Sequence, residues 1–422
     1  MTLELSASDR ALLAGEGGPA AKMSMSILVR MGEVQDAPRL RSITAAHIDS
    51  TIYMGIATLE YAERLAGLGA EVVVPTTLNV AGVDQHGWQE WDVPRDWADK
   101  ARRQMTAYQG MGCTPSWTCA PYQTEARPAL GQQIAWGESS AVVFANSVLG
   151  ARTERYPDLL DICAAITGRV PDVGLHRTEN RAGQLLVRVT GLHPALLASD
   201  ELYPVLGHLV GRLAGDRVVV LDGLDTVPTE DQLKSLGAAM ASSGAVALFH
   251  WVGVTPEAAT LEGALHGRVP AEVVDIGPPE LTQARDQLST SVGDRLDLVV
   301  LGSPHFSLEE FRVLGPLLEG RRRDPRVRFL VTTGRGVKLI AEQAGLLAAL
   351  LDFGGEVTVD TCILATPMLP PEIRTLMTNS AKYAYYTPGL LDRAMAFGST
   401  QACVESAVQG RIVRDDSLWG TH

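Results

Sequence analysis

The sequence predicts an α/β protein built on mostly parallel sheets flanked by helices. From about residue 186, short apolar runs alternate with stretches of helical periodicity, which is typical of βαβ units. Ser307 and Glu310 have the spacing of a capping box, and Pro256 stands at a first helical position. The apolar runs are 216–221, 245–251, 272–276, 297–301, 328–332 and 356–364. The helical stretches are 229–242, 256–265, 279–290, 307–318 and 337–351.

The N-terminal part is less regular. Helices are expected over residues 5–16, 20–31, 60–68 and 96–109, with Gly32 ending the second. Strands are expected at 40–48 and 71–74, the first leading into His47 and Asp49 and the second into Thr76, Thr77 and Asn79. Composition shifts near residues 186 and 290 predict three domains, at 1–185, 186–290 and 291–422.

Composition narrows the class of protein. The chain has 422 residues, 46% apolar and 20% charged, and these values are typical of a soluble globular protein. A net charge of −13 argues against nucleic acid as a partner. No apolar run is long enough to cross a membrane, and the acidic N-terminus does not resemble a signal peptide. Five scattered cysteines do not form a disulfide framework, so a reducing cytoplasm is expected.

The stretch GMGCTPSWTCAPY at 110–122 holds Cys119 on a proline-stiffened loop. Such a thiol could be a metal ligand, or simply a small apolar core residue. No CxxC pair exists, which leaves single cysteines from distant segments, Cys119, Cys362 and Cys403, with Cys113 and Cys163 less favoured. Three thiolates converging from separate loops, with one open metal position, would suit an iron–sulfur Lewis acid.

Other polar positions are open to two interpretations. Arg152 could clamp a substrate carboxylate or belong to a solvated salt-bridge face. Lys382, beside three tyrosines, could contact an anion or lie over aromatic rings. Beyond the expected strand ends, where ligands of parallel sheets collect, stand His250, His305, Thr332 and Cys362. The glycine-rich phosphate loops and the metalloprotease and serine-hydrolase motifs are all missing.

Several long motifs resemble the large, catalytic part of the aconitase X family. They are TLNV (77–80), CAPY (119–122), WGESSAVVFANSVLGART (136–153), GLHRTENR (174–181), VGVTPEA (252–258), GSPHFS (302–307), DTC (360–362) and TNSAKYAYY (378–386). The resemblance runs from about residue 5 to about 412. It implies an aconitase-like, three-domain fold and dehydration of a hydroxy acid.

The resemblance also implies a cofactor, either mononuclear iron or an iron–sulfur cluster (2Fe-2S or 4Fe-4S), held by Cys119, Cys362 and Cys403. Some archaeal relatives carry Cys where this chain has Ser303, so that thiol is absent. Fused relatives continue into a small swivelling domain. Because this sequence ends at His422, a separate small subunit carrying that domain and the general base is expected, which makes a heterodimer.

The expected reaction is loss of water across a Cα–Cβ bond, with iron polarising the hydroxyl and a base removing the α-proton. Each candidate residue could instead be structural. The candidate catalytic residues are Lys382, Glu138 and His176. The candidate substrate-binding residues are Thr76, Thr77, Asn79, Ser139, Ser140, Asn146, Arg152 and Asn379.

Two substrates fit the family. Bacterial members with this style of cysteine loop resemble cis-3-hydroxy-L-proline dehydratases, which form Δ1-pyrroline-2-carboxylate. Archaeal members resemble mevalonate 5-phosphate dehydratases of isoprenoid synthesis. The second substrate needs a basic phosphate site, and no compact basic cluster stands in the motifs, so hydroxyproline is favoured. A metal-free scaffold subunit and an aconitase-type isomerase that rehydrates its product are the competing hypotheses.

Overall fold

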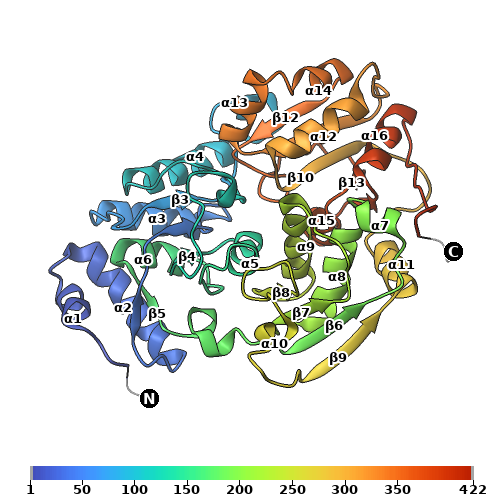
Figure 1. The fold of residues 1–422 in the computed structure, drawn as a ribbon. Helices are drawn as coiled ribbons and strands as arrows, with labels where there is room; N and C mark the ends of the chain where they lie inside the picture. Colours follow the sequence, from blue (N-terminus) through green and yellow to red (C-terminus); the bar gives the residue numbers. More distant parts are fainter. Residues whose placement is uncertain (1–2, 420–422) are drawn as a thin grey trace.

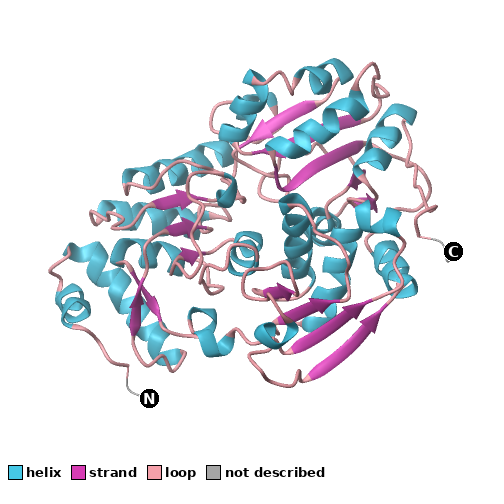
Figure 2. Ribbon diagram, in the orientation of Figure 1, coloured by secondary structure: helices cyan, strands magenta, loops and turns pink. Residues whose placement is uncertain are grey.

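The computed structural model describes residues 3–419, which form three regions, each organised around its own sheets (Figures 1 and 2). Within these residues, three of the four sheets are parallel and helices cover them, so the predicted α/β class is confirmed. None of the helices in these residues is both long and apolar enough to cross a membrane.

The N-terminal region contains a parallel sheet of order β3-β2-β4 and a two-stranded antiparallel pair, β1 with β5. Its strands are β1 (Leu40–Ser42), β2 (Ala46–Ile48), β3 (Thr76–Leu78), β4 (Ala135–Trp136) and β5 (Arg169–Pro171). Its α-helices are α1 (Ala7–Ala14), α2 (Gly18–Val34), α3 (Ile56–Gly67), α4 (Arg95–Gly110), α5 (Ser139–Ser147) and α6 (Leu160–Thr167). Four 3₁₀ turns complete it, η1 (Trp88–Glu90), η2 (Pro121–Gln123), η3 (Gly174–His176) and η4 (Thr178–Asn180).

Three predictions in this region were wrong in detail. The strand expected at 40–48 is two strands, because β1 pairs with β5 while β2 joins the other sheet. No strand forms at 71–74; the backbone there bonds to loops, with Val72 N–H donating to the Met111 carbonyl at 2.9 Å. Helix α2 continues through Gly32, whose missing side chain lets Leu3 and Leu40 pack closely against it.

The middle region is a parallel sheet of order β8-β7-β6-β9 with helices packed on it. Its strands are β6 (Leu185–Val189), β7 (Val219–Asp222), β8 (Phe249–Trp251) and β9 (Glu272–Ile276). Its helices are α7 (Pro194–Ala198), α8 (Leu202–Ala214), α9 (Glu230–Ser243), α10 (Leu261–Ala264) and α11 (Pro278–Gln287). The helix expected at 256–265 is shorter than predicted, because Pro256 lies in a loop and Thr260 caps α10 instead.

The third region is a five-stranded parallel sheet of order β12-β11-β10-β13-β14. Its strands are β10 (Leu298–Phe306), β11 (Arg328–Thr333), β12 (Glu356–Val359), β13 (Thr375–Thr378) and β14 (Ala394–Phe397). Its helices are α12 (Leu308–Leu318), α13 (Arg335–Gln343), α14 (Ala348–Phe353), α15 (Ala381–Leu391) and α16 (Thr400–Gln409). The capping box of Ser307 and Glu310 is present at the start of α12, as predicted.

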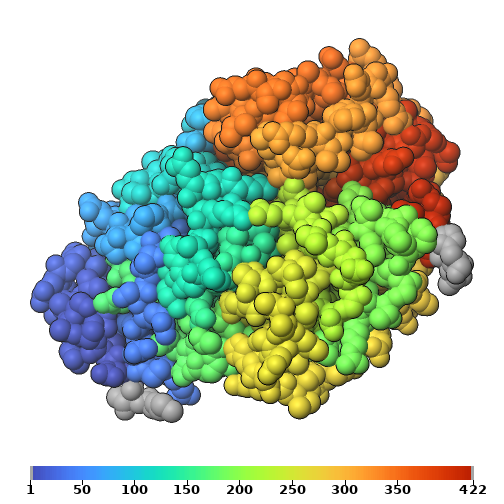
Figure 3. Space-filling view, viewed as in Figure 1, coloured from blue at the N-terminus to red at the C-terminus, as the bar shows by residue number. Residues whose placement is uncertain are grey.

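The regions share a core. One continuous apolar cluster includes Leu59, Val187 and Leu376, one residue from each region. Helix α9 of the middle region packs against both α5 of the N-terminal region and α15 of the third region. The three regions lie in contact on the face drawn in the space-filling view (Figure 3). The domain boundaries at 185 and 290 stay predictions, while the sheets themselves occupy residues 40–171, 185–276 and 298–397.

Candidate active site

Four polar side chains lie at the carboxyl edge of the β3-β2-β4 sheet. His47 lies in β2 and Asp49 directly follows that strand, while Asn79 follows β3 and Glu138 follows β4. The parallel register pairs Ile48 with Leu78 and His47 with Trp136, which brings all three strand ends to one edge. This is the edge where parallel sheets collect ligands.

Glycine is required at position 137 for this arrangement. A β-carbon there would lie 2.9 Å from both the Asp49 β-carbon and Asp161 Oδ2. The close approach holds the start of α5 against the end of β2. Glu138 is the N-cap of α5, and its Oε2 accepts from the Ala141 N–H at 2.6 Å.

A buried lysine reaches this edge from the third region. Lys382, in the first turn of α15, donates from Nζ to Glu138 Oε1 at 2.5 Å and to Ser140 Oγ at 2.9 Å. The side chains of Lys382 and Glu138 are 14% and 5% exposed, so the ion pair is largely shielded from water. It joins residues 244 positions apart in the sequence.

The pair fixes the charge of both partners. Burial acts to raise the pKa of Glu138, but the charge and hydrogen bond of Lys382, with the backbone N–H donors of Ala141 and Ser140, outweigh it and lower that pKa. Burial likewise acts to lower the pKa of Lys382, but the neighbouring Glu138 and Cys119 raise it above its ordinary value. The site therefore presents one ammonium and one carboxylate near neutral pH.

Asp49 is the proton-bearing group beside this pair. Burial, followed by the charges of Glu138 and Asp161, raises the pKa of Asp49 to about 8. Asn79 Nδ2 donates to Asp49 Oδ1, while the buried Asn79 Oδ1 has no partner among the described residues. A carboxyl group that keeps its proton at neutral pH can act as an acid.

His47 is fully buried beside these groups. Burial lowers its pKa to about 3 despite the nearby Glu138, so the ring is neutral. Its Nδ1 shares a 2.8 Å hydrogen bond with Thr77 Oγ1. Its Nε2 is buried without a partner among residues 3–419. The sequence indicated that His47 and Asp49 end a strand, but the candidate set omitted both.

Two cysteines lie next to the Lys382–Glu138 pair. Cys119 and Cys362 belong to one small cluster with Ile52, Val80 and Ala365. Burial, followed by the charge of Glu138, raises the pKa of the Cys119 thiol to about 12, and burial also raises the pKa of Cys362. The loop of Cys362 is tied to the loop after β3, since the Ala81 N–H donates to the Asp360 carbonyl at 2.7 Å.

The structure does not bring Cys403 to this pair. Cys403 lies one turn into α16, fully buried in the apolar core of the third region, with the Gly398 carbonyl 3.9 Å from its sulfur. Within residues 3–419, no three His, Cys, Asp or Glu side chains are placed to hold a metal ion together. The expected convergence of three thiols is therefore corrected to two.

The donor chemistry that remains fits iron held by two sulfurs. Thr361, directly before Cys362, and Asn79, directly before Val80 of the cysteine cluster, each have a buried side-chain oxygen with no partner in the described residues. Thiols and oxygen atoms are suitable donors to iron. The arrangement does not fit a cluster held by Cys119, Cys362 and Cys403.

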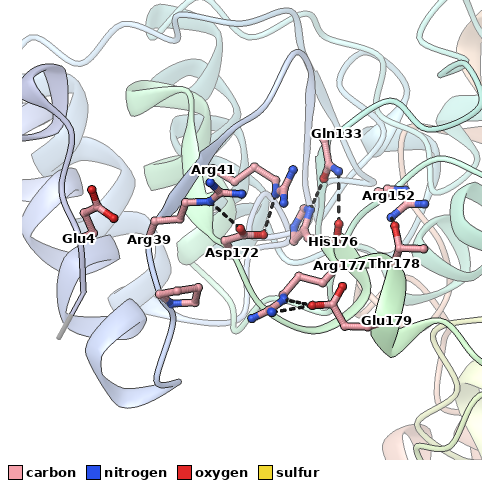
Figure 4. A pocket seen from close by; sticks show the side chains of 11 residues that line it. Glu4, Arg39, Arg41, Gln133, Arg152, Asp172, His176, Arg177, Thr178 and Glu179 are labelled. Atoms are coloured by element: carbon pink, nitrogen blue, oxygen red, sulfur yellow. Dashed lines mark hydrogen bonds and ion pairs between the residues drawn. The ribbon is translucent and has the colours of Figure 1, made fainter. Parts of the chain in front are cut away.

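His176 and Arg152 lie elsewhere, in a cavity of about 520 Å³ (Figure 4). This cavity also contains Arg41 and Gln133, and Gln133 precedes β4 whereas Glu138 follows it. The two predicted residues are therefore at the opposite end of the strand from Lys382. His176 Nδ1 contacts Gln133 Oε1 at 2.7 Å, and its Nε2 bonds the Tyr156 hydroxyl.

The surroundings of His176 and Arg152 account for the pKa of the histidine and the hydrogen bond of the arginine. Burial, with the charge of Arg41 next, lowers the pKa of His176 to about 3. Arg152 donates to Thr178 Oγ1 at 2.7 Å. Neither residue contacts the Lys382–Glu138 pair in the described structure, so the substrate clamp expected at Arg152 is not found at this site.

Some of the remaining candidates contact residues of the site, and the others have structural contacts elsewhere. Ser140 bonds Lys382, Thr77 bonds His47, and Ser139 is the half-buried first residue of α5. Thr76 donates to the Val74 carbonyl at 2.8 Å, which is a backbone role. Asn146 uses its whole amide on Thr153, Ala247 and Arg181. Asn379 Nδ2 donates to Thr400 Oγ1 at 2.9 Å.

The fold and site define an α/β protein of three regions, with a buried lysine–glutamate pair beside two thiols at a sheet edge. Family models for the aconitase X first, second and third domains match residues 2–179, 183–286 and 296–409. The chain belongs to the aconitase X family, which confirms the resemblance seen in the motifs. This family suggests an iron or iron–sulfur cofactor.

Among curated proteins, the chain is 48% identical to cis-3-hydroxy-L-proline dehydratase of Pseudomonas aeruginosa, over 98% of this chain and 72% of that protein. It is 46% identical to the protein of the same name from Hypocrea jecorina, over 97% and 69%. It is 39% identical to the phosphomevalonate dehydratase large subunit of Methanothermobacter thermautotrophicus, over 89% and 92%.

A solved structure, the holo-form of Thermococcus kodakaraensis aconitase X, matches with a TM-score of 0.86 at 31% identity. The match covers 96% of this chain and 100% of that one. The aconitase-like architecture predicted from the motifs is therefore confirmed over nearly the whole chain.

Proposed function

We propose that this protein is a hydro-lyase that dehydrates cis-3-hydroxy-L-proline to Δ1-pyrroline-2-carboxylate. The choice of substrate rests on one comparison: identity is 46–48% to the two hydroxyproline dehydratases and 39% to the phosphomevalonate dehydratase large subunit of Methanothermobacter thermautotrophicus. Dehydratases are hydro-lyases, so the reaction class is common to all three relatives.

The charges of the site support this substrate. Hydroxyproline is a zwitterion, with a carboxylate and a ring ammonium, and the Lys382–Glu138 pair offers one charge of each sign. Mevalonate 5-phosphate carries a carboxylate and a phosphate and no cation. Both of its negative groups would be repelled by the Glu138 carboxylate. In the described structure, Lys382 is the only cation shown bonded to the groups at this edge of the sheet.

The roles of the chain's own residues follow from their contacts. Lys382 binds the substrate carboxylate, and Ser140 keeps the ammonium oriented toward it. Glu138 pairs with the ring ammonium. Cys119 and Cys362 would hold iron, whose contribution when bound is Lewis-acid polarisation of the substrate hydroxyl. The other family-implied ligand, Cys403, has no part in this proposal.

Asp49 supplies the proton for the departing hydroxyl. The Cβ–O bond breaks as Asp49 protonates the oxygen, and water leaves. A base removes the α-proton, and the electron pair of that C–H bond forms the Cα=Cβ bond. The resulting enamine tautomerises to the cyclic imine Δ1-pyrroline-2-carboxylate. Asn79 Nδ2, bonded to Asp49 Oδ1, directs the proton-bearing oxygen toward the substrate.

A partner subunit supplies the base. Several phosphomevalonate relatives are named large subunits, which supports a small-subunit partner for this chain. We place the general base and the swivelling domain on that partner, which makes the active enzyme a heterodimer.

The test is an anaerobic assay of the purified complex with cis-3-hydroxy-L-proline and mevalonate 5-phosphate in parallel. Turnover of hydroxyproline with release of the imine supports the proposal, and turnover of only the phosphorylated substrate overturns it. Iron and sulfide analysis of the same sample distinguishes mononuclear iron from 2Fe-2S and 4Fe-4S clusters.

A further inference from the structure

His305 connects the loops that carry the two site cysteines. It lies near the end of β10, fully buried. Its Nδ1 lies 3.0 Å from Thr118 Oγ1, and its Nε2 lies 3.0 Å from the Thr361 carbonyl. Thr118 and Thr361 directly precede Cys119 and Cys362, so one imidazole spans the two residues before the two thiols.

The hydrogen-bond pattern defines the state of this ring. A carbonyl only accepts, so Nε2 carries the proton and donates to Thr361. Nδ1 then accepts from the Thr118 hydroxyl, which itself accepts from the Ala120 N–H at 3.1 Å. Both ring nitrogens are thus used, and the neutral ring has one orientation.

The backbone of His305 adds a third contact. Its N–H donates to Cys119 Sγ at 3.2 Å, so the same residue fixes the sulfur as well as the loop behind it. This contact comes from the third region to a cysteine of the N-terminal region.

His305 is itself held from the middle region. Lys234 of α9 donates to the His305 carbonyl at 3.4 Å. Lys234 is fully buried and paired with Asp231 at 2.8 Å and with Glu310. A residue anchored on one side and bonded to both cysteine loops on the other cannot shift without moving them.

We propose that His305 is a positioning residue that sets the spacing and orientation of Cys119 and Cys362. The inference rests on the proposed function in one respect, namely that Cys119 and Cys362 are the residues that hold iron. In the metal-free chain, His305 keeps the two thiols side by side and limits their access to solvent.

The test measures thiol alkylation in the full-length, metal-free chain, with iodoacetamide as the probe and mass spectrometry to resolve each cysteine. Loss of two hydrogen bonds in His305→Ala should speed alkylation of Cys119 and Cys362 roughly tenfold. The other three cysteines, Cys113, Cys163 and Cys403, are internal references whose rates should not change.

Two conservative variants separate the two contacts. The Gln side chain places an amide N–H near the position of Nε2 and keeps the bond to the Thr361 carbonyl, so in His305→Gln only Cys362 should keep its slow alkylation. The Asn side chain places an oxygen near the position of Nδ1 and keeps the bond to the Thr118 hydroxyl, so in His305→Asn only Cys119 should keep its slow alkylation. His208→Gln is the matched control, because His208 is also buried but neither of its ring nitrogens has a partner in the described residues. It should leave the Cys119 and Cys362 rates unchanged.

Unchanged rates at both site cysteines in His305→Ala, or an equal rise at all five cysteines, would overturn the inference. Faster alkylation of Cys119 and Cys362 alone supports the inference, even if the protein binds no iron or turns over neither substrate. Such a result, without iron or activity, would count against the proposed function and not against the role of His305.

Discussion

At the residue scale, the central feature is a buried ion pair that serves both folding and chemistry. Lys382 and Glu138 come from different regions, and each neutralises the other where water is largely excluded. Removing one partner of such a pair leaves an uncompensated charge, whereas removing both is much less costly. Stability and activity can therefore be separated by mutation.

Lys382→Met should destabilise the protein by roughly 3–5 kcal/mol, because Glu138 is left buried and unpaired. The double variant Lys382→Met with Glu138→Gln should recover most of that stability but none of the activity. We expect kcat/KM to fall at least ~100-fold in both variants, the size of effect seen on loss of one oriented donor in an active site. Denaturant unfolding and steady-state assays measure the two quantities, and an active double variant would refute the binding role.

The proton on Asp49 predicts a pH dependence. The pKa of Asp49 is raised to about 8, and the protonated form is the proton donor, so kcat/KM should fall as the pH rises through about 8. Asp49→Asn should lower kcat/KM by ~100-fold and remove this alkaline limb. A pH–rate profile of both proteins is the measurement, and an alkaline limb that persists in the variant would assign it to another group.

At the element scale, the two site cysteines lie on loops, Cys119 after α4 and Cys362 after β12, whereas the third candidate lies in a helix. Cys403 belongs to α16, whose buried face also includes Ala402, Val404 and Ala407. A thiol among these residues is a packing group.

Cys403→Ala should therefore retain its iron and keep kcat/KM within about threefold, with a stability loss of roughly 1–2 kcal/mol from the small cavity. Cys119→Ala and Cys362→Ala should lose iron and activity together. Iron analysis of the three variants after anaerobic purification makes the comparison. Loss of iron in Cys403→Ala equal to that in the other two would restore the three-cysteine arrangement.

Local patterns in the sequence account for much of the second half of the fold. Strand β9 coincides with its apolar run at 272–276, and the capping box starts α12 where Ser307 and Glu310 predict it. These signals are local in the chain. The split of 40–48 into two strands depends on which distant strand each half pairs with, and no local pattern contains that information.

The same reasoning applies to the site. Glu138, Ser140 and Lys382 were candidates from the motifs, but their contact joins distant segments that periodicity cannot relate. The polar residues at the end of β2 were visible in the sequence, yet the raised pKa of Asp49 depends on neighbours from other elements. For Cys403, the decisive fact is the face of α16 on which it lies, and a lone cysteine in a sequence does not reveal this.

At the scale of the whole molecule, the end of the described chain is tied back to the middle region. Trp419 Nε1 donates to Glu201 Oε2 at 3.2 Å, beside α8. The Arg285 guanidinium of α11 lies over the same indole, 5.1 Å from the ring centre. Burial raises the pKa of Glu201 to about 7, so this carboxyl is protonated below that pH.

This linkage has a defined sign. The folded pKa is above the ordinary value of 4.5, so the folded state binds more protons and stability falls as the pH rises from 4.5 to about 7. Glu201→Gln keeps an acceptor for Trp419 and removes the charge. The variant should match the wild type near pH 4.5 and exceed it by roughly 2–4 kcal/mol at pH 8. Unfolding free energies across this range test it, and parallel curves would contradict it.

The N-terminal and third regions meet at one place, where the N-terminal sheet edge, the start of α15 and the loop after β12 bring Lys382, Glu138, Cys119 and Cys362 together. The central claim is that iron binds at this junction through two sulfurs. An anomalous difference map at the iron absorption edge, from anaerobically grown crystals of the complex, tests it most directly. A single peak between Cys119 and Cys362 is the expected result, and a peak against Cys403, or none at the junction of an active enzyme, would contradict it.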